Sequence, residues 1–285
     1  MQIVSSPARL TRLLCAERTR GRSIGFVPTL GCLHEGHAAL IRRALKENRV
    51  VAVSLFVNPL QFRLKAYRAY PRDAKKDLLM LQELGVHYVF TPTPEKMYPA
   101  GFDTKVEIGE LVHRLEGKAI RWHYRGVTTV VAKLFNIVQP DRAYFGRKDP
   151  HQLALLQRMV KDLNFRVKIV PVSTRRARDG VALSSRNTLL TPQERKAAAA
   201  LPRAIAQVER KLRLGAASRR ELTKMLRQTL EAEPLVTVDF AAVVDAESLR
   251  EDVFGAQSLI YAAVVIGGKR LTDNKVVKNP KPAAG

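Results

Sequence analysis

The sequence predicts an α/β fold: a parallel sheet covered by helices, followed by a smaller α+β domain. Short β-branched apolar runs alternate with segments of helical periodicity from about residue 23 to residue 172. These runs are nearly continuous in apolar residues, as in strands buried on both faces of a parallel sheet. Beyond Arg186 the order changes to helices followed by strand-like runs. We therefore predict a first domain of residues 1–178 and a C-terminal α+β domain of residues 179–285.

Each strand of the first part is expected where an apolar run lies between turn residues, and each helix where apolar residues follow the helical period. The expected strands cover residues 23–28, 49–57, 86–92, 141–146 and 165–172. The expected helices lie between them, at residues 37–48, 73–85, 126–139 and 150–164. Ligands of parallel sheets bind at the carboxyl ends of the strands, near the point where strand order reverses. A binding site is therefore expected at the turns that follow these strands.

The last part of the chain carries the signals of a second, mixed domain. Thr191 followed by Pro192 is a typical helix start, and one helix is predicted over residues 191–215. Ser218 is expected to cap another helix over residues 218–233. Strand-like runs follow at residues 236–245, 258–268 and 269–277.

Charge is the outlying feature of the composition. The chain has 49 Lys and Arg against 26 Asp and Glu, a formal net charge of +23. A field of this size favours anionic partners such as nucleotides, RNA or acidic lipids. The basic residues are spread along the chain and match no recognisable nucleic-acid-binding module, so a solvated basic surface is favoured over binding to a nucleic acid.

Targeting signals and cysteines add little. No window approaches the roughly 18–20 apolar residues of a membrane-spanning helix, and the N-terminal stretch lacks the order of a signal peptide. A cytoplasmic protein without a membrane partner is expected. Cys15 and Cys32 form neither a disulfide framework nor a metal-binding spacing.

The stretch PTLGCLHEGH, residues 28–37, joins an expected strand to a helix. Gly31 and Gly36 permit a tight turn, and the first N–H groups of the helix favour an anion. His34 and His37 can donate hydrogen bonds, and a protonated imidazole would add charge where a pentacovalent phosphate develops it. The stretch indicates a phosphate site, with two surface histidines in a turn as the plainer alternative. His-Glu-x-x-His, Walker A and Gly-x-Gly-x-x-Gly patterns are absent.

Three further stretches place polar residues at expected turns. In YFGRKDPHQ, Lys148 suits a phosphate oxygen and Gln152 suits a hydroxyl or carboxylate. In FVNPLQF, Gln61 places a neutral amide after a strand. RDGVALSSRN, residues 178–187, offers two hydroxyls and an arginine. Each stretch alone is equally compatible with an ordinary turn.

Taken together, these stretches resemble the pantothenate synthetases, also called pantoate–β-alanine ligases. The family's motif Pro-Thr-Met-Gly-x-Leu-His-x-Gly-His appears here as PTLGCLHEGH. Its other motifs appear as FVNPLQF, as YRGVTTVVAKLF and as LSSRN, in the same order. The resemblance extends from about Phe26 to Asn274, nearly the whole chain.

The resemblance implies a two-step ligation. Family members use ATP and Mg²⁺ to adenylate pantoate, releasing pyrophosphate, and the amine of β-alanine then displaces AMP to give pantothenate. It also implies a Rossmann-like nucleotidyltransferase fold, related to class I aminoacyl-tRNA synthetases, with an ATP- and pantoate-binding domain, a C-terminal lid domain and a homodimer. A related acyl-adenylate-forming ligase, or a weakened homologue that binds nucleotide or RNA, stays open.

The resemblance also assigns roles to individual residues. His37 matches the proton donor, and His34, Lys148 and Arg186 are predicted catalytic residues with it. Such residues suit in-line displacement at phosphorus, which needs positioning and charge neutralisation more than covalent chemistry. The positions matched to ATP binding are Leu30, Gly31, Cys32, Leu33, His34, Glu35, Gly36, His37, Gly146, Arg147, Lys148, Asp149, Arg175, Leu183, Ser184, Ser185 and Arg186.

Gln61 and Gln152 match the pantoate contacts, and Gln61 also matches a position near β-alanine. Asp77 matches a metal-binding position. Here Lys76 precedes Asp77 where the family often has an acidic pair, which weakens the metal site.

Other departures also add positive charge. Arg147 replaces a glutamate, and Arg175 replaces a small apolar residue that contacts adenine. Tighter ATP binding with slower turnover is the expected effect. The segment RLKAYRAYPRD after Gln61 is basic and poor in glycine, which argues against a mobile lid there.

Overall fold

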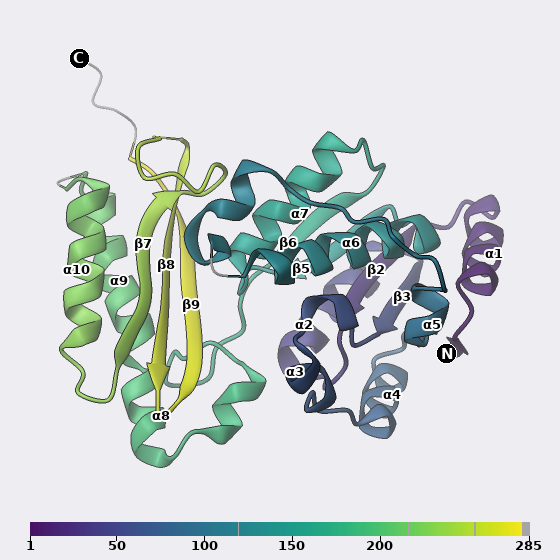
Figure 1. Ribbon diagram of the computed structural model, residues 1–285, viewed down its shortest axis with the longest axis horizontal. Helices are drawn as coiled ribbons and strands as arrows, with labels where there is room; N and C mark the ends of the chain where they lie inside the picture. Colours follow the sequence, from purple (N-terminus) through teal and green to yellow (C-terminus); the bar gives the residue numbers. More distant parts are fainter. Residues whose placement is uncertain (119, 216, 254, 281–285) are drawn as a thin grey trace. The chain divides into compact units, whose positions relative to one another are not determined.

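The computed structural model describes residues 1–118, 120–215, 217–253 and 255–280; the side chains of Lys118, Ser185 and Thr188 also lie outside the description. The chain divides into two compact units (Figure 1). The first comprises Met1–Val112 and Ala119–Ser173, and the second comprises His113–Lys118 and Thr174–Gly285. The break after Ser173 falls near the predicted boundary at residue 178, whereas the excursion of His113–Lys118 into the second unit was not predicted.

A parallel sheet forms the centre of the first unit. Among the described residues its strands are β1 (Gln2–Val4), β2 (Ile24–Thr29), β3 (Val50–Leu55), β4 (Tyr88–Phe90), β5 (Arg142–Gly146) and β6 (Lys168–Val172). They are arranged in the order β1-β4-β3-β2-β5-β6, and each neighbouring pair is parallel. After β2, the next strand in sequence, β3, pairs with β2 on one side. The later strand β5 pairs with β2 on the other side. The strand order therefore reverses between β2 and β5.

Helices cover both faces of this sheet, as expected for a parallel arrangement. They are α1 (Pro7–Thr19), α2 (Glu35–Glu47), α3 (Leu64–Arg68), α4 (Ala74–Glu83), α5 (Pro94–Met97), α6 (Arg121–Val138) and α7 (Pro150–Asp162). Short 3-10 turns are η1 (Pro59–Gln61) and η2 (Glu110–His113); η3 (Leu115–Lys118) belongs to the second unit.

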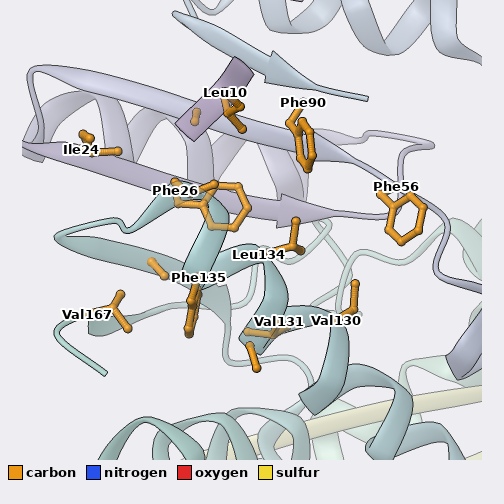
Figure 2. Packing of buried hydrophobic residues seen from close by; sticks show 14 of the residues in the cluster. Leu10, Ile24, Phe26, Phe56, Phe90, Val130, Val131, Leu134, Phe135 and Val167 are labelled. Atoms are coloured by element: carbon orange, nitrogen blue, oxygen red, sulfur yellow. The ribbon is translucent and has the colours of Figure 1, made fainter. Parts of the chain in front are cut away.

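Alternate residues of β2 point to the two faces. Phe26 packs into a core with residues of α1, α6 and α7, while the next residue, Val27, joins Ile41 of α2 and Leu81 of α4 on the other face. Figure 2 shows the first core from close by. The residues labelled there are Leu10, Ile24, Phe26, Phe56, Phe90, Val130, Val131, Leu134, Phe135 and Val167. Full burial of a large apolar side chain contributes roughly 1.5–3 kcal/mol, so these cores hold the helices against the two faces of the sheet.

The second unit is an α+β arrangement. In its described part, β7 (Thr237–Asp245), β8 (Gln257–Ile266) and β9 (Lys269–Lys278) form an antiparallel sheet in that order. Its helical segments are η4 (Ser185–Leu189), α8 (Pro192–Ala198), α9 (Ala200–Arg213) and α10 (Arg219–Glu231) (Figure 1). Ile205 of α9, Leu226 of α10 and Ile260 of β8 belong to one core, which joins the helices to the sheet.

The predicted fold class, a parallel α/β fold with a smaller C-terminal α+β part, is confirmed. Two predicted helices differ: α6 begins at Arg121 and not at residue 126, and the single helix predicted over residues 191–215 is two helices, which meet at Ala199. Pro202 has no N–H to donate to the Ala198 carbonyl, and its ring crowds that carbonyl. The segments β1, α1, α3 and α5 were not predicted. Among the helices of the described ranges, none is both long enough and apolar enough to cross a membrane.

Candidate active site

Three neighbouring strands deliver the predicted residues of the first unit to one edge of the sheet. In the order β3, β2, β5, they lead to η1 with Gln61, to α2 with His34 and His37, and to the turn with Lys148 (Figure 1). Parallel strands end at the same edge, and the edge next to the β2–β5 reversal is where such sheets bind ligands. The expected location of the site therefore agrees with the strand order.

The loop between β2 and α2 has an unusual backbone that several hydrogen bonds fix. Gly31 has φ 83° and Cys32 has φ 53°, so both are left-handed. That conformation costs a non-glycine residue about 1–2 kcal/mol. The Thr29 hydroxyl donates to the Ser54 carbonyl at 2.7 Å and accepts from the Gly31 N–H at 3.2 Å. These bonds fix the first half of the loop against β3.

The two histidines cap helix α2. Nδ1 of His34 accepts from the Gly36 N–H at 3.0 Å, and Nδ1 of His37 accepts from the His34 N–H at 3.3 Å. Their ring centroids are 4.1 Å apart. Because Nδ1 is the acceptor in both rings, the proton of each neutral imidazole is on Nε2. The corner therefore carries two N–H donors beside the positive end of a helix, the arrangement that favours an anion.

Both histidines are neutral at pH 7. Burial, the positive charge that His34 carries when it is protonated, and the charge of Lys148 lower the pKa of His37 from 6.5 to about 3. Burial and Lys148 also lower the pKa of His34. Desolvation and a neighbouring cation therefore disfavour the protonated imidazole that would add charge at a phosphate. The positive charge at this corner comes from Lys148 and the helix end.

Acidification is expected to destabilise the protein through His37. Between its folded pKa of about 3 and its ordinary value of 6.5 the unfolded chain binds more protons, so stability falls as pH decreases through this window. Within this window each pH unit changes the free energy of unfolding by about 1.4 kcal/mol. Because the ring is partly exposed, the free energy of unfolding is expected to fall by about 2 kcal/mol from pH 6.5 to about pH 4.5. The measurement is urea unfolding at the two pH values.

His37→Gln is the matched control, because glutamine at this position keeps the capping hydrogen bond and does not titrate. The variant is expected to lose about 2 kcal/mol less than the wild type over the same interval. Equal losses in the two proteins would contradict the lowered pKa of His37.

Asn58 orients Gln61, a role that the sequence did not reveal. The fully buried Asn58 side chain donates to Gln61 Oε1 and to the Gly126 carbonyl, each at 3.0 Å. Its Oδ1 accepts from the Tyr98 hydroxyl at 2.7 Å and from the Leu60 N–H at 3.3 Å. Because Gln61 Oε1 already accepts a bond, its amide nitrogen is the group best suited to donate to a substrate. The Asn-Pro pair after a strand was the signal that could have identified Asn58.

The turn after β5 holds Lys148. The Arg147 N–H donates to the Val172 carbonyl at 2.9 Å, which fixes the turn against β6. The Lys148 side chain is 24% exposed and its Nζ lies 4.0 Å from Asp149 Oδ1. Asp149 precedes α7, and Gln152 is partly buried in the first turn of that helix. The positive charge of Lys148 contributes to lowering the pKa values of both histidines.

The remaining predicted ATP-binding residues belong to the second unit. The Leu183 N–H donates to the Arg175 carbonyl at 2.9 Å, and Ser184 Oγ accepts from the Arg186 N–H at 3.3 Å. Arg176 holds this turn by a bidentate pair with the buried Asp273, at 2.6 and 2.8 Å. The predicted Ser185 side chain lies outside the described residues. A role of this turn in ATP binding stays a prediction.

The predicted metal ligand, Asp77, lies against the β2–α2 loop. Asp77 is 3% exposed, and both of its carboxylate oxygens accept main-chain N–H groups of the β2–α2 loop, from Cys32 at 2.8 Å and from Leu33 at 2.7 Å. In the part of the chain that the structure describes, no three His, Cys, Asp or Glu side chains converge on a metal position. The carboxylate of Asp77 thus binds the loop, and its assignment as a metal ligand stays a prediction.

Comparison with known proteins decides the family. The family model described as pantoate-beta-alanine ligase matches residues 2–276. The chain belongs to this ligase family. The resemblance identified from the sequence motifs is thereby confirmed.

Curated relatives in the ligase family align over nearly their whole length. The pantothenate synthetase of Carboxydothermus hydrogenoformans is 46% identical over 272 residues, which covers 94% of this chain and 96% of the relative. The pantothenate synthetase of Sinorhizobium medicae is 45% identical and covers 99% and 98%.

Solved structures of the pantoate-beta-alanine ligase family have the same fold. The pantothenate synthetase of Thermus thermophilus superposes with a TM-score of 0.87 at 44% identity, covering 96% of this chain and 99% of that one. The pantoate-beta-alanine ligase of Francisella tularensis, crystallised with beta-gamma ATP and beta-alanine, has a TM-score of 0.76 at 33% identity and covers 97% of each chain.

The basic departures of this ligase-family member leave the backbone of the turns intact. At Arg147 the main-chain N–H pairs with β6, and at Arg175 the main-chain carbonyl accepts from Leu183. Lys76 is exposed near the start of α4. Main-chain pairing does not require a particular side chain, so these two bonds do not depend on the charge at Arg147 or Arg175.

Proposed function

We propose that this protein condenses (R)-pantoate with β-alanine to give pantothenate, through a pantoyl adenylate, with release of pyrophosphate and AMP from ATP. The observation that carries the proposal is the β2–α2 corner, where two neutral imidazoles and Lys148 meet at the strand-order reversal. Membership of the ligase family supports it, as does the Francisella tularensis ligase crystallised with an ATP compound and beta-alanine.

In the first step, a carboxylate oxygen of pantoate attacks the α-phosphorus of ATP and pyrophosphate leaves with the bonding electrons. No proton has to move in this step. The chain must hold the phosphates and offset the charge on the oxygens, which Lys148, the end of α2 and the Nε2–H groups of His34 and His37 are suited to do. The low pKa of His37 suits a hydrogen-bond donor to phosphate rather than an acid that gives up its proton.

In the second step, the neutral amine of β-alanine attacks the acyl carbon, AMP leaves with the electrons of the C–O bond, and the nitrogen releases one proton to water as the amide forms. We assign Gln61 and Gln152 to holding pantoate through this step, because a neutral amide can donate to a hydroxyl or carboxylate without adding charge. Asn58 fixes the direction in which Gln61 presents its amide. A closed, dry site would protect the adenylate from hydrolysis.

Mg²⁺ is proposed to reach the site on the ATP phosphates, since Mg²⁺ keeps several waters and is often held through substrate phosphates. When bound it supplies charge neutralisation. A homodimer and a cytoplasmic location, implied by the resemblance and by the absence of targeting signals, stay predictions, as does the absence of a nucleic-acid partner.

The proposed reaction is tested by the substrates that each half requires. AMP and pantothenate are expected to form only when ATP, pantoate and β-alanine are all present. Exchange of labelled pyrophosphate into ATP is expected with pantoate alone. Exchange with another hydroxy acid in place of pantoate would instead indicate a different acyl-adenylate ligase. If neither pantothenate nor labelled ATP formed, and the protein bound RNA with an affinity that falls steeply with salt, the result would support the weakened-homologue alternative.

A further inference from the structure

Asp77 of α4 lies against the loop that leads to the two histidines. It is 45 residues away from Cys32 in sequence, yet its Oδ2 accepts the Cys32 N–H at 2.8 Å and its Oδ1 accepts the Leu33 N–H at 2.7 Å. Only 3% of the residue is exposed. Hydrogen bonds to a carboxylate are shorter and stronger than those between neutral groups. One buried side chain therefore holds two successive amides of the loop.

These two bonds act where the loop backbone is least favourable. Cys32 is in the left-handed region at φ 53°, and Gly31 before it is at φ 83°. A Cβ on Gly31 would lie 3.0 Å from Asp77 Oδ2, so the carboxylate is packed closely against this turn. Such a backbone persists only where the surroundings determine it. Asp77 supplies the contacts that determine it.

The same contacts set the position of the phosphate corner. Leu33 is followed directly by His34, which caps α2 and whose N–H donates to His37 Nδ1. A shift of the loop amides would therefore move both imidazoles and the first turn of α2 together. Misplacement of catalytic groups by about 1 Å can cost about 100-fold in rate.

The surroundings of Asp77 disfavour a cation. Both oxygens already face N–H donors, whose positive ends point at the carboxylate. On the same helix Lys76 precedes it and Met80 lies one turn later. Mg²⁺ requires oxygen ligands in near-octahedral geometry, which lysine and methionine do not supply.

We infer that Asp77 is a positioning residue that holds the turn before His34 and is not a ligand of Mg²⁺. As a statement about catalysis this inference rests on the proposed function. As a statement about the loop it does not. The two parts are therefore tested by separate measurements.

The catalytic part is tested with Asp77→Asn in pyrophosphate exchange. The amide keeps one acceptor oxygen but turns its NH₂ group toward the second loop N–H, so kcat/KM for ATP is expected to fall about 10- to 100-fold. The Mg²⁺ concentration that gives half the maximal rate is expected to stay unchanged. A rise of about tenfold or more in that concentration, with the rate restored by excess Mg²⁺, would show that Asp77 is a metal ligand and overturn the inference.

Asp73→Asn is the matched control. Asp73 caps the same helix, where its Oδ1 accepts the Lys76 N–H at 3.0 Å, but it is exposed. This variant is expected to keep kcat/KM for ATP within about twofold of wild type. An equal loss in both variants would mean that any weakening of α4 lowers activity, and Asp77 would have no special role.

The loop part is tested by hydrogen exchange without any substrate. The Cys32 and Leu33 amides are expected to exchange slowly in the wild type and at least about tenfold faster in Asp77→Asn. In the wild type, added Mg²⁺ is expected to leave both rates unchanged, and this arm remains informative even if the variant does not fold. Unchanged rates in the variant, or acceleration by Mg²⁺, would refute the inference whether or not the protein proves to be the proposed ligase.

Discussion

Replacing Gly126 by alanine is expected to destabilise the first unit by about 3 kcal/mol and to lower pyrophosphate exchange about 100-fold. Gly126 of α6 lies against η1, and a Cβ there would sit 2.3 Å from the Leu60 carbonyl oxygen and 2.7 Å from the Gln61 nitrogen. These are main-chain atoms, which cannot rotate away as a side chain can. Accommodation of the methyl group would move η1 and with it Gln61.

The same substitution also acts on Asn58, because the Gly126 carbonyl accepts its Nδ2–H at 3.0 Å. The free energy of unfolding is to be measured by urea unfolding. Pyrophosphate exchange is to be measured on the folded protein. Gly109→Ala is the matched control, since no described atom lies within 4 Å of the Cβ that it would add. If Gly126→Ala behaved like Gly109→Ala in both measurements, the close contact between α6 and η1 would not position Gln61.

Replacing Lys148 by alanine is expected to lower kcat/KM for ATP in pyrophosphate exchange about 1,000-fold, the size of effect seen when one preorganised electrostatic group is removed. The pKa values of His34 and His37 are expected to rise in the same variant, because the Lys148 charge contributes to lowering both. Exchange kinetics measure the first effect, and NMR titration of the imidazoles measures the second.

Lys161→Ala is the matched control for charge, because Lys161 is exposed in the last turn of α7, the helix that follows the turn with Lys148. This variant is expected to change kcat/KM for ATP in pyrophosphate exchange by less than about twofold. It is expected to leave the pKa values of His34 and His37 unaltered. If kcat/KM for ATP in pyrophosphate exchange by Lys148→Ala remained within about twofold of the wild-type value, Lys148 would not belong to the proposed phosphate site.

The fold class could be predicted because its signals are local. The buried run of β3 and the apolar period of α6 each identify an element without reference to the rest of the chain. Some local signals were overlooked: Ser6 followed by Pro7 starts α1, and Pro202 separates α8 from α9. These errors concern turn chemistry that the sequence does contain.

The site could be predicted only as a set of residues. The stretch around His34 and His37 indicates an anion site, but the protonation of the rings depends on burial and on Lys148, which comes from the turn after another strand. Asp77 likewise binds the loop from a distant helix, and the contact of Gly126 with η1 joins segments far apart in the chain. Spacing along the chain carries no information about such contacts until the fold brings the segments together.

Two neutral imidazoles, protonated on Nε2, are proposed to receive the ATP phosphates at the start of α2. The most direct measurement is NMR of the protein with ¹⁵N-labelled histidine, recorded against pH and then against ATP. At pH 7 both rings are expected to carry the proton on Nε2 alone. His37 is expected to be still neutral at about pH 5, because its pKa is about 3. ATP is expected to shift the Nε2 resonances of both rings. Titration of His37 near pH 6.5, or resonances that saturating ATP leaves unmoved, would contradict the account.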